Sequence, residues 1–120
     1  MNLIFKMDGV ICKHEDPMLM KHAQPLINVT EFMQWLTQQG HHITIWCERP
    51  NTLEMKMMTE DWLYVNQIPY DRLVFDRPKS PIFVDITPSE AQYYKHEAHN
   101  QIISDLFNEW KTVVKNTDVL

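Results

Sequence analysis

The sequence predicts a single α/β domain with a mainly parallel central sheet and helices on both faces. Short apolar runs alternate with segments whose apolar residues recur at helical spacing, in the order strand, helix, strand, helix, strand, strand, helix. The first run, residues 2–5, is almost entirely apolar, as in a buried strand of a parallel sheet. A chain of 120 residues, 44% hydrophobic and 22% charged, has the length and composition of one soluble globular domain spanning residues 1–120.

The first helix shows the clearest terminal signals. Asn28 is a good N-cap residue, and Glu31 follows it at the third position, as in a capping box. Gly40 is expected to end this helix. The remaining elements are expected as strands at residues 42–46, 72–75 and 82–85, a helix opened by Pro50 and Asn51-Thr52 that ends before Pro69, and a last helix over 89–115 interrupted near His99-Asn100.

Composition excludes several classes of function. The net charge is −5 and no basic block occurs, so we expect no binding of nucleic acid. No apolar run reaches the length of a membrane span, and the N-terminus lacks the pattern of a signal peptide. Cys12 and Cys47 are expected to be free thiols in a reducing cytoplasm. With only two glycines in the chain, a glycine-rich phosphate loop is excluded.

Polar residues follow each expected strand. They lie at residues 6–9, 47–51, 76–79 and 85–88. Because the carboxyl ends of parallel strands meet at one edge of a sheet, these segments are expected to converge there, where ligands of such sheets bind.

The first of these segments carries a recognisable motif. Residues 3–11 form an apolar strand that runs into Asp8-Gly9. This stretch resembles the first motif of the haloacid dehalogenase-like phosphatases, a hydrophobic strand followed by Asp-x-Asp-Gly. In that family the first aspartate attacks phosphorus and the second transfers the proton. Asp8 stands at the acid/base position, but Lys6 stands at the nucleophile position, and an ammonium group cannot form an aspartyl-phosphate.

The second and third motifs are also altered in their chemistry. Residues 43–50 resemble the strand that ends in a phosphate-binding Thr or Ser, with Cys47 at that position, and a thiol is a weak donor. Residues 68–78 resemble the stretch that ends in Gly-Lys-Pro, with Arg77 at the lysine position and Lys79 nearby. Positive charge is retained there, but its reach and geometry differ.

The fourth motif of the family ends in two aspartates that complete a Mg²⁺ site. Residues 82–88 keep Asp85 but carry Ile86 at the second position. Glu90 is a weak substitute, because a proline loop lies between. Asp8 and Asp85 therefore form an incomplete metal site, which we expect to bind no Mg²⁺.

The resemblance covers nearly the whole chain and implies a three-layer Rossmannoid fold without a large cap domain. Four altered motifs predict a degenerate active site, hence a catalytically inactive module that binds an anion, a ligand or a partner. The alternative is a Mg²⁺-dependent phosphohydrolase with an unusual active site. No cofactor is expected, unless the domain is active and uses Mg²⁺.

The role of Lys6 has two interpretations. Its ammonium group could pair with Asp8 or Asp85 as a built-in counter-ion, in the space that a metal would fill. It could instead belong to an anion-binding cup for a phosphorylated small molecule. The candidate cup comprises Lys6, Cys47, Glu48, Arg49, Arg77 and Lys79. For the domain as a whole, a further hypothesis is a purely structural interaction domain that associates with a second copy of the chain.

Overall fold

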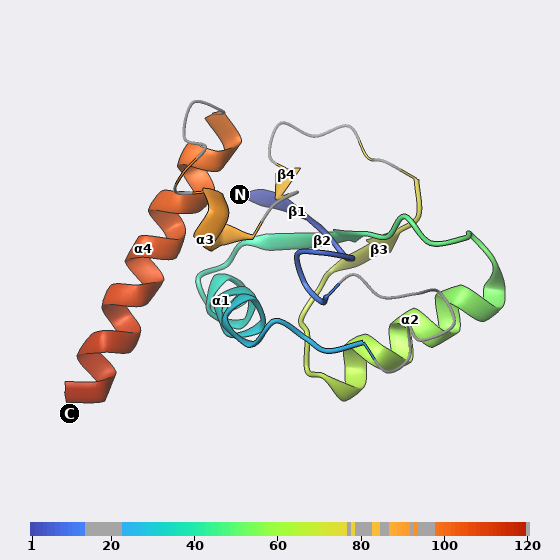
Figure 1. Ribbon diagram of the computed structural model, residues 1–120, viewed down its shortest axis with the longest axis horizontal. Coiled ribbons are helices and arrows are strands. Elements are labelled where there is room, and N and C mark those ends of the chain that lie inside the picture. The colour runs from blue at the N-terminus through green and yellow to red at the C-terminus, as the bar shows by residue number, and fades with distance from the viewer. Residues whose placement is uncertain are drawn as a thin grey trace.

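A computed structural model shows a mixed α/β fold (Figure 1). It describes residues 1–13, 23–76, 78, 83–84, 87–91, 93 and 98–119. In chain order the elements are β1 (Asn2–Lys6), α1 (Ile27–Gln38), β2 (His42–Trp46), α2 (Leu53–Val65), β3 (Arg72–Val74), β4 (Phe83–Val84), α3 (Pro88–Ala91) and α4 (Ala98–Val119).

The strands form a parallel sheet with β1 in its interior, as the sequence predicts. The order of the four-stranded sheet is β3-β2-β1-β4, and each neighbouring pair is parallel. The register places Asn2 opposite His42 and Lys6 opposite Trp46. The chain steps from β1 to β2 and β3 in one direction, and β4 lies on the other side of β1. Such a reversal creates a crevice at the carboxyl ends of the strands, where ligands of open α/β sheets bind.

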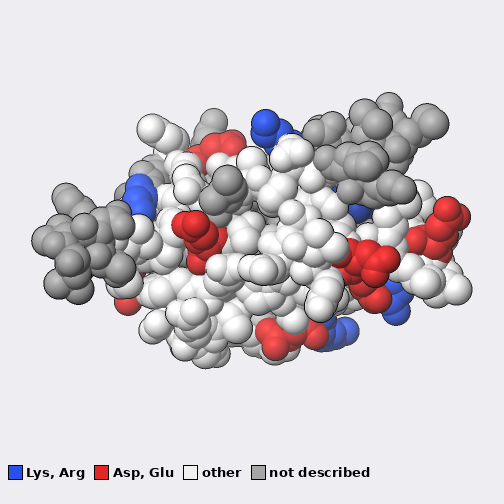
Figure 2. Space-filling model, turned by 90° about the horizontal axis from the view of Figure 1, so that it is seen from below, with Lys and Arg blue, Asp and Glu red and all other residues white. Residues whose placement is uncertain are grey.

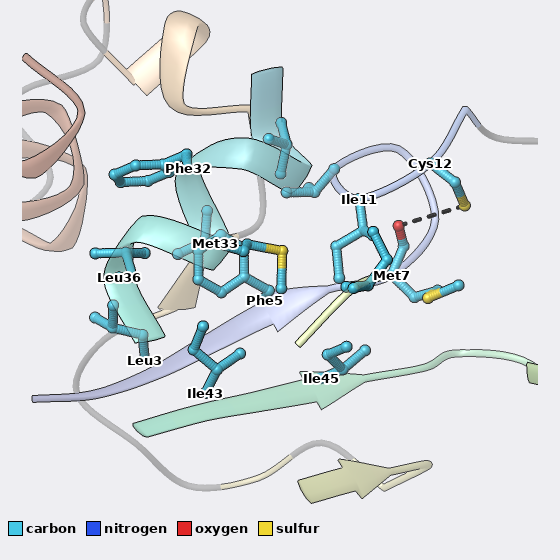
Figure 3. Packing of buried hydrophobic residues seen from close by; sticks show 14 of the residues in the cluster. Leu3, Phe5, Met7, Ile11, Cys12, Phe32, Met33, Leu36, Ile43 and Ile45 are labelled. Carbon is cyan, nitrogen blue, oxygen red and sulfur yellow. Dashed lines mark hydrogen bonds between the residues drawn. The ribbon is translucent and has the colours of Figure 1, made fainter. Parts of the chain in front are cut away.

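One face of the sheet forms the main core with α1 (Figure 3). Side chains alternate between the faces of a strand, so every second residue of β1 and β2 points toward this core. The fully buried residues of this layer are Leu3, Phe5, Met7, Ile43, Ile45, Phe32, Met33 and Leu36. This alternation directs the residues between them, including Lys6, toward the opposite face.

The helices α1 and α2 lie on the same side of the strands (Figure 1). This agrees with right-handed connections, because β1 to β2 and β2 to β3 step in the same direction. The helix α4 packs against α1 through aromatic rings, with the Phe32 and Phe107 centroids 5.3 Å apart and those of Phe32 and Trp110 5.9 Å apart. A complete three-layer arrangement stays a prediction.

The start of α1 differs from the expectation. The helix begins at Ile27 with Leu26 at the N-cap and no side-chain capping bond, so the predicted Asn28 cap is wrong. The backbone explains the shift, because the Leu26 amide donates to the Ile11 carbonyl oxygen at 2.9 Å and fixes the entry of the chain. Gly40 follows the helix with φ 86°, a conformation that favours glycine.

The other boundaries agree closely with the sequence. The strand β2 coincides with the expected residues 42–46, and β3 is one residue shorter than the expected 72–75. The last helix is interrupted between α3 and α4, whereas the expected break near His99-Asn100 falls inside α4. Neither residue is a strong helix breaker, and an asparagine costs little near a helix start.

The helix α4 is the longest element, with 22 residues. Its buried side chains include Ile103, Phe107 and Trp110, which recur at helical spacing. Among the described residues, no helix combines the length and the apolar character that crossing a bilayer requires.

Candidate functional site

The carboxyl ends of the first strands meet at one edge of the sheet. The Met7 amide donates to the Trp46 carbonyl oxygen at 2.9 Å, and the Cys47 amide donates to the Val74 carbonyl oxygen at 2.9 Å. The segments that follow β1, β2 and β3 therefore start side by side. Arg77, Lys79 and Asp85, which the sequence assigns to the same edge, lie outside the described residues.

A tight turn after β1 places Asp8. The Gly9 amide donates to the Cys12 carbonyl oxygen at 2.8 Å, and the Ile11 amide donates to the Met7 carbonyl oxygen at 3.0 Å. Gly9 has φ 90°, which a side chain would strain. The Cys12 thiol lies 3.7 Å from the Met7 carbonyl oxygen (Figure 3) and 3.5 Å from Asp8 Oδ1. The turn thus brings a carboxylate and a thiol together at the strand end.

A buried ion pair between Arg49 and Asp8 is the centre of this site. Arg49 Nη2 lies 2.9 Å from Asp8 Oδ1, and Arg49 Nε lies 3.2 Å from Asp8 Oδ2. Arg49 is only 5% exposed. Its Nη1 donates to Thr59 Oγ1 at 3.2 Å, and this hydroxyl donates to the Met55 carbonyl oxygen at 2.8 Å. The two hydrogen bonds from the guanidinium to the carboxylate, together with the bond to Thr59, therefore join the turn after β1 to the segment after β2 and to α2.

Arg49 remains protonated and positively charged although it is buried. Burial by itself lowers the pKa of Arg49, but the hydrogen bonds and the negative charge of Asp8 more than reverse this, so the pKa lies above its usual value. Both carboxylate oxygens of Asp8 accept from the guanidinium. Loss of either partner would leave a buried charge without its counter-ion.

Lys6 is oriented differently from the expectation. Its Nζ lies 3.6 Å from Glu48 Oε2, and the side chains of Lys6 and Glu48 are 30% and 51% exposed. The predicted pairing of Lys6 with Asp8 is wrong, because strand alternation turns Lys6 away from the core and Arg49 already occupies both oxygens of Asp8. Pairing with Asp85 falls outside the described residues.

The two cysteines are free and fully buried. Burial, together with the charge of Asp8, raises the pKa of Cys12 to about 12. Burial also raises the pKa of Cys47, although the Arg49 backbone amide and charge act in the opposite direction. Both thiols therefore remain protonated near neutral pH, which disfavours a thiolate nucleophile at the Cys47 position.

The described residues do not fit a Mg²⁺ site. An ammonium group occupies position 6, and the oxygens of Asp8 are engaged by Arg49. Glu90 serves a local cap, since its Oε1 accepts from the Thr87 hydroxyl at 2.8 Å and its amide donates to Thr87 Oγ1 at 3.3 Å. Within the described part of the chain, no group of three or more His, Cys, Asp or Glu side chains could hold a metal ion.

Sequence reasoning missed the two polar partners of this ion pair. Thr59 lies on the buried face of α2 beside Trp62 and Leu63. In the sequence, the sign of its role is a threonine that shares a helix face with apolar residues. The sequence indicates only that Cys12 is a free thiol. Its place beside Asp8 depends on the turn at Gly9, whose geometry the sequence does not specify.

Comparison with known proteins identifies the fold and no family. No family model matches the chain, and no curated protein matches it. A crystallographic target protein from Vibrio cholerae is similar, with a TM-score of 0.61 and 21% identity over 90% of this chain and 97% of that chain. A chain of the Pnkp1/Rnl/Hen1 complex is also similar, with a TM-score of 0.53 and 22% identity over 67% of this chain and 31% of that chain. At these identities the likeness concerns the fold alone.

Proposed function

We propose that this chain is a haloacid dehalogenase-like domain with a degenerate active site, which does not transfer phosphoryl groups and binds a ligand or a protein partner. The observation that carries the proposal is the pair of cations at the end of β1 and β2. Lys6 occupies the nucleophile position of the resembling motif, and Arg49 holds Asp8 at the acid/base position.

The missing step is the formation of a covalent intermediate. A phosphatase of this family needs a carboxylate that attacks phosphorus, and the ammonium of Lys6 has no lone pair to offer when it is charged. Asp8 stands at the position that transfers the proton, but both of its oxygens accept hydrogen bonds from Arg49. The site thus lacks the nucleophile and, among the described residues, the ligands of a metal.

The binding role rests on the exposed members of the predicted cup. Lys6 is partly exposed and is paired at 3.6 Å with Glu48, which is half-exposed, so this ion pair is weak and can be exchanged. Arg49 is buried and engaged, and therefore contributes to the architecture rather than to an open anion site. An anionic group of a cytoplasmic ligand would meet Lys6 first.

Hydrolysis of p-nitrophenyl phosphate with Mg²⁺ and with chelator tests the loss of catalysis. We expect no turnover above that of an unrelated control protein. Asp8→Asn and Glu48→Gln serve as a matched pair, one at the acid/base position and one at an exposed neighbour. Mg²⁺-dependent turnover that disappears in Asp8→Asn but persists in Glu48→Gln would establish the alternative, an active phosphohydrolase.

The Lys6→Asp variant tests the assignment of position 6. It removes the pair with Glu48 and places a carboxylate where the family has its nucleophile. We expect a small loss of thermal stability in chelator, because the new acid lies near Glu48, and partial recovery with Mg²⁺ by mass action. Melting curves with and without Mg²⁺ measure both effects. Equal melting temperatures with and without Mg²⁺ would show that Asp8 stays bound to Arg49 and that a carboxylate at position 6 does not by itself restore a metal site.

A further inference from the structure

The helix α2 has a second apolar face that points away from the domain. Its buried side carries Thr59, Trp62 and Leu63. On the opposite side Leu53, Met57 and Tyr64 are 74%, 56% and 86% exposed. These three residues are four and seven positions apart and therefore lie along one line of the helix, here called the α2 stripe. A helix that is apolar on both faces is unusual at a free surface.

Acidic side chains lie on and beside the α2 stripe: Glu60 falls on its line between Met57 and Tyr64, and Glu54 and Asp61 lie along one flank. Glu54, Glu60 and Asp61 lie on α2, and Lys56 is the basic residue of the same helix. Figure 2 shows the molecule from the side on which α2 lies, where both acidic and basic side chains are spread among uncharged ones. The whole chain carries a net charge of −5. An occupant of the stripe would therefore meet apolar anchors within a negative field.

A second copy of the chain fits this surface poorly. Antiparallel pairing about the middle of the stripe would bring Asp61 level with Lys56 of the other copy, but it would leave Glu54 level with Leu63 and Glu60 level with Met57. Parallel pairing would bring Glu60 level with Glu60. Like charges placed opposite each other are unfavourable, and two chains of net charge −5 also repel at long range. Charge complementarity instead favours a basic occupant.

We propose that the α2 stripe is a docking surface for a basic amphipathic helix of a partner protein. The partner would place apolar side chains on Leu53, Met57 and Tyr64, with lysine or arginine residues at the flanks beside the acidic side chains. The surface is held in place before binding, because Thr52 caps α2 and Thr59 joins the helix to Arg49. The docking surface goes beyond the proposed function, since it does not depend on whether the site at Asp8 is active.

The probe is a fluorescent helical peptide with leucines on one face and lysines on both flanks. Its control is a twin peptide with the same leucines and glutamates on the flanks. Fluorescence anisotropy with the full chain should show binding of the lysine peptide, weaker binding at high salt, and no comparable binding of the glutamate twin. Equal binding of both peptides would overturn the proposal, because the acidic flanks would then have no role.

Variants locate the binding surface. Met57→Ala and Tyr64→Ala should each weaken binding of the lysine peptide by about tenfold, a loss typical of a truncated interface anchor. Val65→Ala is the matched control, because Val65 is also exposed on α2 but lies about 100° around the helix from Tyr64. Circular dichroism checks that each variant is folded. Equal weakening by Val65→Ala, or none by Tyr64→Ala, would refute the α2 stripe.

Sedimentation velocity tests whether a second copy of the chain, the other possible occupant, covers the α2 stripe. The proposal predicts a monomer in the absence of the peptide. A dimer that dissociates in the Tyr64→Ala variant would show that a second copy covers the stripe, and would overturn the assignment of a basic partner. The phosphatase assay is unaffected by either result, so the two proposals fail independently.

Discussion

Replacement of Arg49 by methionine should strongly destabilise the domain. The guanidinium makes two hydrogen bonds to Asp8 and one to Thr59, and Arg49 is 5% exposed. Methionine has a similar length but no charge, so the Asp8 carboxylate would remain partly buried without its counter-ion. Removal of one partner from a buried pair costs about 3–5 kcal/mol. For a domain of this size such a loss lowers the melting temperature by more than about 10 °C.

Two comparison variants isolate the cause. Lys6→Met removes an exposed pair at 3.6 Å and should cost less than about 1 kcal/mol. The double variant Asp8→Asn/Arg49→Met removes both charges and should be more stable than Arg49→Met alone, because no unpaired charge remains.

Urea unfolding followed by tryptophan fluorescence and by circular dichroism measures these free energies. If Arg49→Met is too unstable to give a folded baseline, the double variant still decides the question, because its partial recovery is the expected result. A loss below about 1 kcal/mol in Arg49→Met, or a double variant no more stable than the single one, would refute the account of Arg49 as the counter-ion of Asp8.

Two further predictions follow from local geometry. Burial raises the pKa of Cys12 from 9.0 in the unfolded chain to about 12 in the folded protein. The protonated thiol therefore contributes fully to the free energy of unfolding below pH 9, and this contribution is lost as the pH rises from 9 to 12. In this pH range the free energy of unfolding of the parent should fall more steeply than that of Cys12→Ala. Thr52 caps α2 by accepting from the Met55 amide at 3.1 Å, so Thr52→Ala should cost about 1 kcal/mol in urea unfolding, whereas Thr112→Ala, an exposed residue inside α4, should cost much less.

The parallel sheet and most of its strand boundaries can be predicted from the sequence. The apolar run of β1, the helical spacing in α1 and the turn residues between them specify alternating strands and helices, and a parallel sheet follows from that alternation. These signals are local, since each depends on residues only a few positions apart. The start of α1 differs from the predicted one because a backbone hydrogen bond from Leu26 to Ile11, which joins two separate segments, outweighs the capping preference of Asn28.

The cation that neutralises Asp8 can be identified only from the folded chain. The sequence placed Lys6 and Arg49 at the same sheet edge, and Lys6 is the nearer of the two along the chain. Strand alternation turns Lys6 outward to Glu48, while the turn at Gly9 brings Asp8 to the guanidinium of Arg49. A Coulomb interaction depends on distance in space and on the surrounding dielectric, and neither quantity can be read from spacing along the chain.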